Sequence, residues 1–349
     1  MRDRMKRTGL AAAMLSFLLA AMALIGCAPQ VPTERSGFLL DTYVEMTLYG
    51  MDEESGAAEA KRVLDGAFDL CRAYEQQFSR TIAESDIARI NAAQGQPVEV
   101  NEETAWLLAE AAAYSRASDG FFDVTIGGAS ALWDFKAKKP SVPADADIAA
   151  ALEGVGYEKI NIEGNVVTLV SAVTQLDLGA IAKGYISDKL AAYMQAQGVP
   201  GAVINLGGNV VTVGSRPNGE AWGIGVQKPF AAEGELVGVL RVTGLAKAAI
   251  VSTGVYERSF TLDGTLYHHI LNPQTGRSAE SDMHAVTIIA ESGMAADVLG
   301  TMVFGLGAEE GLAYLEQMPD VEGIVIRADG RIDMTTGIGA DGAIAFDPQ

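Results

Sequence analysis

The second half of the chain constrains the fold most, because it is a series of short strand-like segments with only two helical interruptions. β-Branched and other apolar residues fill stretches such as "NVVTLV", "GAVINL", "NVVTVG" and "HAVTIIA", which Gly-containing turns separate. The helical patterns lie at about 179–196 and 293–318. Short strands and grouped helices favour an α+β domain over a doubly wound α/β fold. We predict a single mixed α+β domain with a mostly antiparallel sheet and clustered helices.

The first half is richer in helical patterns. "FLLDTYVEMTLYG" alternates as a strand does, and an amphipathic helix is expected from about residue 55 to 78. A further helix is expected over "NEETAWLLAEAAAYSRASDG", with Asn101 as its N-cap and Gly120 as its stop. The charged, Pro-containing segment "KAKKPSVPADAD" indicates an exposed loop rather than a linker between domains.

Residues 1–26 have the organisation of a secretory signal. The basic "MRDRMKR" precedes an apolar run of 17 residues, and "LIGC" then places a small residue before Cys27. This order resembles a bacterial lipobox. A transmembrane anchor is the alternative, although 17 residues are short for a membrane span. We expect removal of residues 1–26, lipidation of Cys27, a tether over residues 27–37 and a folded domain over residues 38–349. The protein would then be extracytoplasmic and anchored to a bacterial membrane by its lipid, since two or more acyl chains anchor stably.

The chain is strongly acidic, which limits its partners. It carries 25 basic and 45 acidic side chains, a net charge of −20. Removal of residues 1–26 takes away four basic residues and one acidic residue, which leaves a net charge of −23. Such a surface repels nucleic acid and anionic headgroups, so nucleic acid is not expected as a partner. A phosphate-bearing ligand must therefore be held locally, by a metal ion or by backbone amides.

The chain has two cysteines, Cys27 and Cys71. With Cys27 lipidated, no internal disulfide can form despite the oxidising compartment. Cys71 lies in a helical run, and we expect it to be a buried small apolar residue.

A first candidate site is the stretch "QLDLGAIAKGY", residues 175–185, which leads into apolar residues at helical spacing. Asp177 is a favoured N-cap residue, so an ordinary capped helix with a solvated Lys183 explains the stretch. A helix start after Gly179 also leaves backbone amides open to an anionic ligand. The residues alone leave both interpretations open.

A second candidate site is "SGMAADVLGTMVFGLG", residues 292–307, in which Asp297 and Thr301 are four residues apart and share one helix face. A carboxylate among Met, Ala, Val, Leu and Phe costs free energy unless something compensates it. Asp297 could instead favour the helix dipole, and Thr301 could bond to the carbonyl four residues earlier. The residue types favour an oxygen-ligand site for a hard cation such as Mg²⁺.

Two of the three histidines of the chain lie in "LYHHILNPQTGRS". A buried histidine packed in a strand is one interpretation. The adjacent "NPQTGR" indicates a surface turn, so at least one ring should reach a cleft, where histidine suits general-base work near neutral pH. In "INLGGNV", Gly207 and Gly208 permit either close backbone approach or a tight turn between strands.

These stretches, in this order, resemble the ApbE family of FAD:protein FMN transferases. The resemblance runs from about residue 38 to residue 346 and rests on "DLGAIAKGY", "INLGGN", "STGVYER", "HHILNPQTGR" and "AADVLGTMVFGLG". Five ordered motifs are specific, whereas any one of them would be weak. The resemblance implies an ApbE-like, T-fold-like domain.

The resemblance also implies roles for residues at the matching positions. His269 is the expected base. The expected Mg²⁺ ligands are the backbone carbonyl of Ala180 and the side chains of Asp297 and Thr301. The expected FAD contacts are Leu40, Thr81, Phe121, Phe122, Asp123, Asp177, Lys183 and Leu271.

The chain departs from the family pattern at two of these flavin contacts. Leu40-Asp41-Thr42 stands where Met-Gly-Thr is usual, and Thr81 stands where a tyrosine is common. Loss of that aromatic ring concerns how the flavin is stacked and leaves the metal ligands intact.

The activity implied by the resemblance is Mg²⁺-dependent transfer of FMN from FAD to a Ser or Thr hydroxyl of an acceptor protein, with release of AMP. The expected acceptors are flavoprotein subunits of membrane redox complexes. Two alternatives use the same residues: an Mg²⁺-dependent FAD pyrophosphatase, and a non-catalytic lipoprotein that binds flavin. The internal run "DMTTGIGA" has Ile338 where the acceptor motif needs Ala, so self-flavinylation is not expected.

Overall fold

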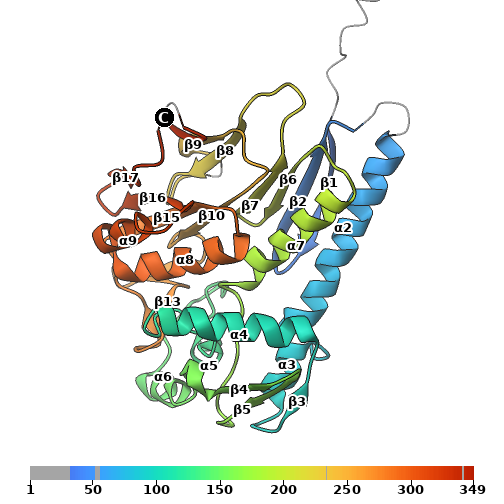
Figure 1. Ribbon diagram of the computed structural model, residues 1–349. Helices are drawn as coiled ribbons and strands as arrows, with labels where there is room; N and C mark the ends of the chain where they lie inside the picture. The colour runs from blue at the N-terminus through green and yellow to red at the C-terminus, as the bar shows by residue number, and fades with distance from the viewer. Residues whose placement is uncertain (1–31, 52–55, 233, 340–341) are drawn as a thin grey trace, which may run out of the picture.

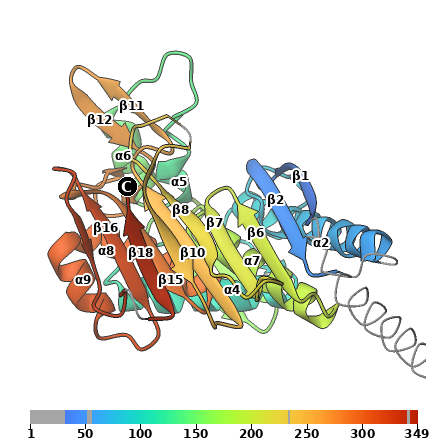
Figure 2. The same cartoon turned by 90° about the horizontal axis from the view of Figure 1, so that it is seen from above.

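The computed structural model describes residues 32–51, 56–232, 234–339 and 342–349. The expected signal and Cys27 lie outside the described residues. Within those ranges, no helix is both long and apolar enough to cross a membrane. A central sheet organises the fold (Figures 1 and 2), and each of its neighbouring strands pairs antiparallel. In spatial order its strands are β1 (Thr33–Leu39), β2 (Thr42–Tyr49), β6 (Gly201–Leu206), β7 (Asn209–Gly214), β10 (Lys247–Gly254), β15 (Met283–Ala290), β16 (Glu322–Arg327) and β17 (Ile332–Met334).

Smaller sheets and helices surround this central sheet. The other strands, grouped by sheet, are β18 (Ile344–Pro348), β9 (Leu236–Val242) and β8 (Trp222–Gln227); β3 (Val98–Glu99), β5 (Val166–Leu169) and β4 (Ile160–Glu163); β11 (Ser259–Leu262) and β12 (Thr265–His268); β13 (Leu271–Asn272) and β14 (Arg277–Ser278). The helices are α2 (Gly56–Phe78), α3 (Asp86–Ala92), α4 (Glu102–Ala117), α5 (Gly127–Ser130), α6 (Asp145–Leu152), the 3₁₀ turn η1 (Tyr157–Lys159), α7 (Ala182–Ala196), α8 (Gly293–Leu306) and α9 (Ala308–Leu315). The predicted single mixed α+β domain with a mostly antiparallel sheet is confirmed.

The two faces of the central sheet are covered differently. Helix α7 packs on β6 and β7, and α8 packs on β10 and β15. On the opposite face the sheet β18-β9-β8 contributes Trp222 and Leu240 to a second core with Ile250 and Ile289 of the central sheet. A fold of helices on one face and a small sheet on the other buries both faces of β10 and β15, which explains why these strands read as continuous apolar runs.

Local sequence patterns explain the elements that hold the helix layer. In β2, Val44, Met46 and Leu48 alternate with more exposed residues and are at most 1% exposed. Burial of each such side chain stabilises the fold by about 1.5–3 kcal/mol. Cys71 of α2 is fully buried, as predicted, and burial raises the pKa of its thiol to about 12.

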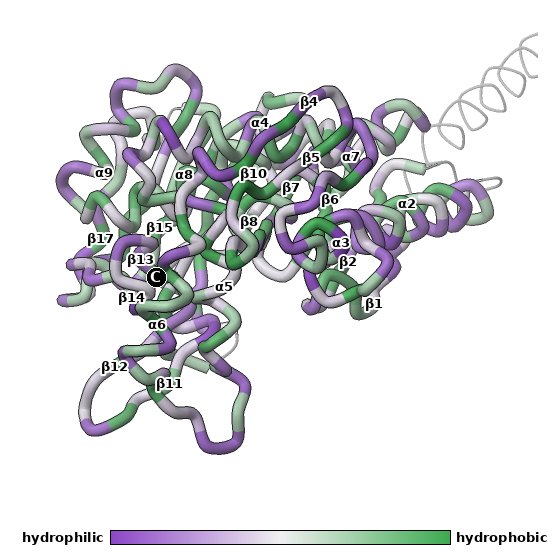
Figure 3. The backbone as a smooth tube through the Cα atoms, turned by 90° about the horizontal axis from the view of Figure 1, so that it is seen from below, coloured by the Kyte–Doolittle hydropathy of each residue, from purple (hydrophilic) through white to green (hydrophobic). Residues whose placement is uncertain are grey.

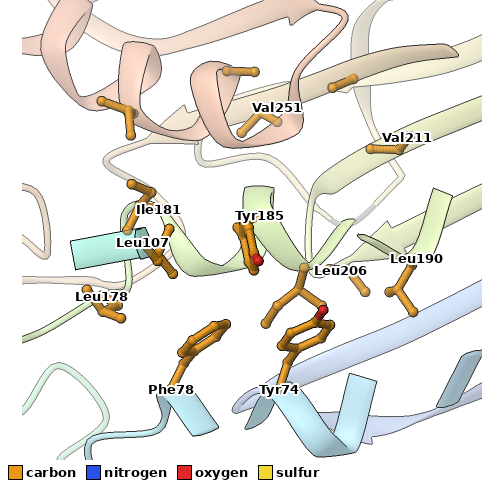
Figure 4. Close-up of a cluster of buried hydrophobic side chains, with 14 of the residues drawn as sticks. Tyr74, Phe78, Leu107, Leu178, Ile181, Tyr185, Leu190, Leu206, Val211 and Val251 are labelled. Atoms are coloured by element: carbon orange, nitrogen blue, oxygen red, sulfur yellow. The ribbon is translucent and has the colours of Figure 1, made fainter. Parts of the chain in front are cut away.

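An aromatic cluster joins α2 to α7 (Figure 4). Tyr74 and Phe78 of α2 are stacked with their centroids 5.6 Å apart. Tyr185 of α7 meets both rings edge-on, with centroid distances of 5.8 Å and 5.7 Å. Edge-to-face contacts of this kind add about 0.5–1.5 kcal/mol beyond the buried area. The first helical turn of α7, on which the candidate site depends, is therefore fixed from one side by α2.

Several predicted boundaries differ from the structure. Strand β1 begins at Thr33, inside the segment expected to be tether, because all seven of its residues pair with β2. Helix α7 begins at Ala182 rather than near residue 179. The helix expected over 293–318 is two helices, because Gly307 has a φ of 84° and ends α8. Asn101 is at the N-cap of α4, but its side-chain amide donates to Asp86 instead of capping.

Candidate active site

Asp177 lies in the loop before α7 and does not cap the helix, which was one of the two interpretations that the sequence left open. Its Oδ1 accepts a hydrogen bond from the Gly179 amide at 2.9 Å, and its Oδ2 accepts one from the Ser130 hydroxyl at 2.8 Å. The Arg80 Nε lies 3.5 Å from that Oδ2, and Arg80 also donates to the Ser130 hydroxyl. The Asp177 amide donates to the Val124 carbonyl at 2.8 Å, which ties the loop to the segment around residue 124. Arg80, which the motifs did not indicate, is therefore a cation held beside Asp177.

Thr81 follows Arg80 directly and is exposed. Its hydroxyl lies 3.1 Å from the hydroxyl of Ser79. Thr81 therefore lies at the surface next to Arg80 of the Asp177 cluster, and threonine offers no ring for stacking.

The start of α7 is shaped by Asp297 of α8, which is 5% exposed. The Asp297 Oδ2 accepts a hydrogen bond from the Gly184 amide at 2.9 Å. The first helical hydrogen bond of α7 runs from the Tyr185 amide to the Ile181 carbonyl. The Gly184 amide, one residue earlier, therefore does not donate to the Ala180 carbonyl. The predicted open helix start is therefore partly filled by a carboxylate of the protein. The Ala180 carbonyl is left available to a ligand.

Ala180, Asp297 and Thr301 fit a hard cation. The Asp297 Oδ1 has the Lys183 ammonium at 3.8 Å, which is beyond hydrogen-bond distance, so this oxygen can accept a cation. Thr301 lies one turn later on α8 and is partly exposed. A carboxylate, a carbonyl and a hydroxyl are the oxygen donors that Mg²⁺ takes while keeping several waters. The described residues contain no cluster of three or more His, Cys, Asp or Glu side chains suited to a metal, so substrate oxygens or water would complete the shell.

Charged groups of both signs surround Lys183. Burial raises the pKa of Glu257 to about 7, the charges of Lys183 and Arg258 oppose this rise, and the Asp297 carboxylate adds to it. Glu257 keeps some exposed surface, yet the protein around its carboxylate removes enough water to disfavour the charge. The Glu257 carboxylate is therefore influenced by the charges of Lys183, Arg258 and Asp297.

The two adjacent histidines have different surroundings. His268 is 5% exposed and meets the Phe304 ring edge-on, with centroids 5.7 Å apart. His269 is partly exposed, and its amide donates to the Arg258 carbonyl at 3.1 Å. Burial, together with the positive charges of Arg258 and Lys183 and the neighbouring His268, lowers the pKa of His269 to about 3. His269 is therefore neutral at pH 7, and its Nδ1 has no hydrogen-bond partner among the described residues. That is the form a general base needs.

In the predicted flavin-contacting segment "FFDV", only the side chain of Phe121 among the three predicted contacts is partly exposed. Phe122 is 2% exposed in the core, and the Asp123 Oδ1 accepts hydrogen bonds from the amide and hydroxyl of Thr125 at 2.8 Å and 2.6 Å. Burial raises the pKa of Asp123. Phe121 is partly exposed and covers Gly305 of α8, where an added Cβ would lie 2.1 Å from the ring. The side chains of Phe122 and Asp123 are thus buried, whereas that of Phe121 is partly exposed.

Leu271 is likewise buried, at 8% exposed, in a small cluster with Trp133 and Ile148. Phe260 of β11 and Tyr267 of β12 pack against this cluster. The hairpin β11–β12 projects from the body of the protein (Figures 2 and 3). Lys136, from the loop beside that hairpin, pairs with Asp41 at 2.6 Å. The side chain of Leu271 therefore supports the hairpin rather than lining a surface.

Two tight turns meet beside this hairpin. Leu40 and Asp41 join β1 to β2 with φ values of 56° and 57°, and Gly207 and Gly208 join β6 to β7 at 61° and 97°. An added Cβ on Gly207 would lie 2.0 Å from the Thr42 hydroxyl, so the turns are in contact. A two-residue turn with positive φ at both positions favours Gly. This explains why a glycine is usual at the position of Asp41.

Comparison with known proteins shows the family and the fold of the chain. The sequence model of the ApbE family matches residues 40–325. The chain belongs to the ApbE family. A FAD:protein FMN transferase of Klebsiella pneumoniae is 37% identical over 294 residues, which are 83% of this chain and 88% of the relative. A FAD:protein FMN transferase of Treponema pallidum is 30% identical over 320 residues, 87% of each chain.

Solved structures of the ApbE family have the same fold. The ApbE protein of Thermotoga maritima superposes with a TM-score of 0.77 at 28% identity, covering 88% of this chain and 97% of that one. The flavin transferase ApbE of Vibrio cholerae gives a TM-score of 0.74 at 28% identity, with the same coverage. The recognition and the fold inferred from five motifs are therefore confirmed, whereas the roles of individual site residues stay predictions.

Arg80 and Glu257 are charged residues of this ApbE-family site that sequence reasoning missed. Glu257 lies within the quoted motif "STGVYER", and Arg80 lies next to Thr81, so both are within or beside stretches that the sequence had already indicated. Nothing in the spacing of the chain indicated that Arg80 meets Asp177 or that Glu257 approaches Lys183, because each pair is far apart in sequence.

Proposed function

We propose that the protein transfers FMN from FAD to a Ser or Thr hydroxyl of an acceptor flavoprotein and releases AMP, with Mg²⁺ as its cofactor. The observation that carries this proposal is the Asp297 carboxylate, whose Oδ2 is held by the Gly184 amide while its Oδ1 faces Lys183 at 3.8 Å. One oxygen is thus fixed and the other is available beside a cation. The names of the relatives support the reaction, and the neutral His269 supports the proton transfer it needs.

The reaction makes and breaks one bond to the FMN phosphorus. The acceptor oxygen forms a phosphoester bond with that phosphorus, the bond to the bridging oxygen of the pyrophosphate breaks, and AMP departs with the electron pair. His269 takes the hydroxyl proton on the unprotonated nitrogen of its neutral ring. Lys183 and Arg80 attract the phosphates in an otherwise acidic protein. When bound at Ala180, Asp297 and Thr301, Mg²⁺ would neutralise and polarise the pyrophosphate.

The acceptor and the location belong to the same proposal. We expect the acceptors to be flavoprotein subunits of membrane redox complexes, reached by a protein that a lipid on Cys27 anchors outside the cytoplasm. The lipobox-like "LIGC" supports the anchor. In a bacterial host, Cys27→Ala should accumulate as a precursor with the mass of the full chain. Normal cleavage of that variant at another residue would contradict lipidation at Cys27.

A transfer assay tests the reaction itself. Wild-type protein, FAD, Mg²⁺ and a purified acceptor domain should give a flavin-fluorescent acceptor band and one AMP per labelled acceptor. Mass spectrometry should find the acceptor heavier by an FMN group less water. His269→Ala should bind FAD about as well as wild type but transfer roughly 10²–10⁴-fold more slowly. The matched control is His284→Ala, because His284 is a partly exposed histidine outside the site and should leave the rate unchanged.

The same assay separates the alternatives. Replacing the modified hydroxyl residue of the acceptor by Ala should abolish the labelled band. FMN and AMP formed equally fast with and without acceptor, with no labelled band, would indicate a pyrophosphatase. Tight FAD binding with neither product would indicate a flavin-binding protein without catalysis.

A further inference from the structure

Helices α7 and α8 meet at their N-terminal ends, which is an electrostatically unfavourable arrangement (Figure 1). Each helix N-terminus carries a partial positive charge and unpaired amides, so two facing N-termini repel. The contact is close, because an added Cβ on Gly184 would lie 2.2 Å from the Gly293 carbonyl oxygen. An added Cβ on Gly293 would lie 2.4 Å from the Ser187 hydroxyl. Something must compensate the two positive ends.

Each helix supplies a carboxylate to the N-terminus of the other. Asp297 of α8 accepts from the Gly184 amide of α7, as described above. In return, Asp188 of α7 accepts from the Gly293 amide at 2.7 Å and the Met294 amide at 3.1 Å of α8. The same short pattern, Gly followed four residues later by Asp, occurs in "GYISD" and "GMAAD". The crossing is thus held by two carboxylates with reciprocal roles.

The two carboxylates differ in the groups that contact them besides the helix amides. The Lys247 ammonium lies 2.7 Å from the Asp188 Oδ1, and both side chains are about four-fifths buried. The Ser292 hydroxyl donates to the Asp188 Oδ2 at 3.1 Å. Asp297 has instead the more distant Lys183, at 3.8 Å. Lys247 of the protein therefore neutralises Asp188 directly, whereas Asp297 has no cation in direct contact among the described residues and can bind one.

We propose that Asp188 is a positioning residue for the cation site: by holding the first amides of α8, it sets where the Asp297 carboxylate lies against the start of α7. This inference rests on the proposed function, which gives Asp297 its ligand. Asp188 touches neither FAD nor the metal. It acts through the placement of α8, because Asp297 and Thr301 are on that helix and Ala180 precedes the other one. Displacing the start of α8 would separate the cation ligands without removing any of them.

The test follows the Mg²⁺ dependence of FAD binding by flavin fluorescence in the full chain. Asp188→Asn loses the charge and at least one of the two amide bonds. It should raise the Mg²⁺ concentration at half-saturation by about tenfold or more, as changes behind metal ligands typically do. At saturating Mg²⁺, FAD affinity should return to that of wild type, and the transfer rate should lie within about twofold of it. This split between Mg²⁺ affinity and rate is not expected from general destabilisation.

The matched control is Glu103→Gln on α4, which removes an ion pair to Lys189, the neighbour of Asp188 on α7. Glu103 pairs with Lys189 of α7 at 2.7 Å, the same distance as the pair between Asp188 and Lys247. This variant should lower the melting temperature yet leave the Mg²⁺ midpoint unchanged. If Asp188→Asn does not fold, Ser292→Ala removes one bond to Asp188 and should shift the midpoint in the same direction by a smaller factor.

The outcomes separate the positioning role from the proposed function. Mg²⁺-dependent binding in wild type with an unshifted midpoint in Asp188→Asn and Ser292→Ala would overturn the role of Asp188 alone. Equal shifts in Asp188→Asn and Glu103→Gln would also overturn it, because the effect would then reflect stability. FAD binding that ignores Mg²⁺ in wild type would overturn the cation site and this inference together.

Discussion

Asp297 uses its two carboxylate oxygens for different purposes, which makes its substitution informative. Its Oδ2 satisfies the Gly184 amide in a buried helix crossing, while its Oδ1 is free of hydrogen bonds at Lys183. A carboxylate with only a structural task would gain nothing from an unbonded oxygen in an apolar helix, because the desolvated charge costs free energy. The bond to Gly184 is therefore the structural task of Asp297, and the unbonded oxygen is the one that the proposed cation would take.

Asp297→Asn should separate these two tasks. The amide oxygen can still accept from Gly184, so the melting temperature should stay within a few degrees of wild type. Asp297→Ala should cost about 1 kcal/mol of unfolding free energy, as loss of a cap does. Both variants should lose Mg²⁺-dependent FAD binding, measured by flavin fluorescence. An Asp297→Asn variant with normal Mg²⁺ dependence would show that the carboxylate is structural.

His269 should titrate far below an ordinary histidine. Burial and the nearby positive charges lower its pKa to about 3 in the folded protein, against about 6.5 for the unfolded chain. Between these values the unfolded state binds a proton that the folded state does not, so this residue makes the protein less stable as pH falls from 6.5 towards 3. Urea unfolding at pH 7 and pH 5 should show a smaller loss in His269→Ala than in wild type. An imidazole resonance of His269 that titrates near pH 6.5 would contradict the enclosed geometry.

At the scale of elements, the approach of α7 to α8 depends on two glycines rather than on large side chains. Gly184 and Gly293 let the backbones touch, and only then can each carboxylate reach the amides of the other helix. The aromatic cluster of Tyr74, Phe78 and Tyr185 holds α7 from its other side. The crossing is therefore rigid, which suits a site that must present a carboxylate and a carbonyl at fixed positions.

Gly293→Ala should force the two helices apart. The new Cβ would lie 2.4 Å from the Ser187 hydroxyl and 2.8 Å from the Gly184 carbonyl oxygen, which is backbone and cannot rotate away. We expect a loss of about 1–3 kcal/mol in unfolding free energy, as for other overpacked positions. Gly128→Ala is the control, since an added Cβ in that short helix meets nothing closer than 3.8 Å. Equal stability of the two variants in urea denaturation would contradict the tight crossing.

At the scale of the whole molecule, β1 is an integral part of the central sheet. It forms the end strand, pairs with β2 along its length and buries Leu39. Its turn into β2 also carries Leu40 and Asp41 to the neighbourhood of Gly207. The central sheet therefore includes residues that precede the predicted domain start at residue 38.

Two truncated variants test this boundary. A chain that begins at residue 32 should unfold in a single cooperative transition and bind FAD. A chain that begins at residue 40 lacks β1 and should lose at least about 1.5–3 kcal/mol from Leu39 alone, with a new exposed edge on β2. Urea denaturation followed by circular dichroism measures both. Equal stability of the two variants would show that β1 is dispensable.

The sequence by itself determined the strand and helix classes, the mixed α+β architecture and the family. These depend on local periodicity and on ordered short motifs, which the linear chain displays directly. The same local patterns identified Asp297 as a carboxylate in an apolar helix and His269 as a histidine beside a surface turn. The ends of the helices were less well determined. Gly307 ends α8 and a loop precedes α7 up to Ala182, and the pattern of apolar residues does not indicate either backbone conformation.

Only the tertiary structure decided how the site is assembled. A helix cap was one of two interpretations of Asp177, but a fold that brings Ser130 and Arg80 beside it gives its carboxylate other partners. The amide expected to be open at the start of α7 is bonded to Asp297, which is more than a hundred residues away in sequence. Which carboxylate meets which amide is set by the close crossing of two helices. That crossing is a property of packing in three dimensions, and no spacing along the chain records it.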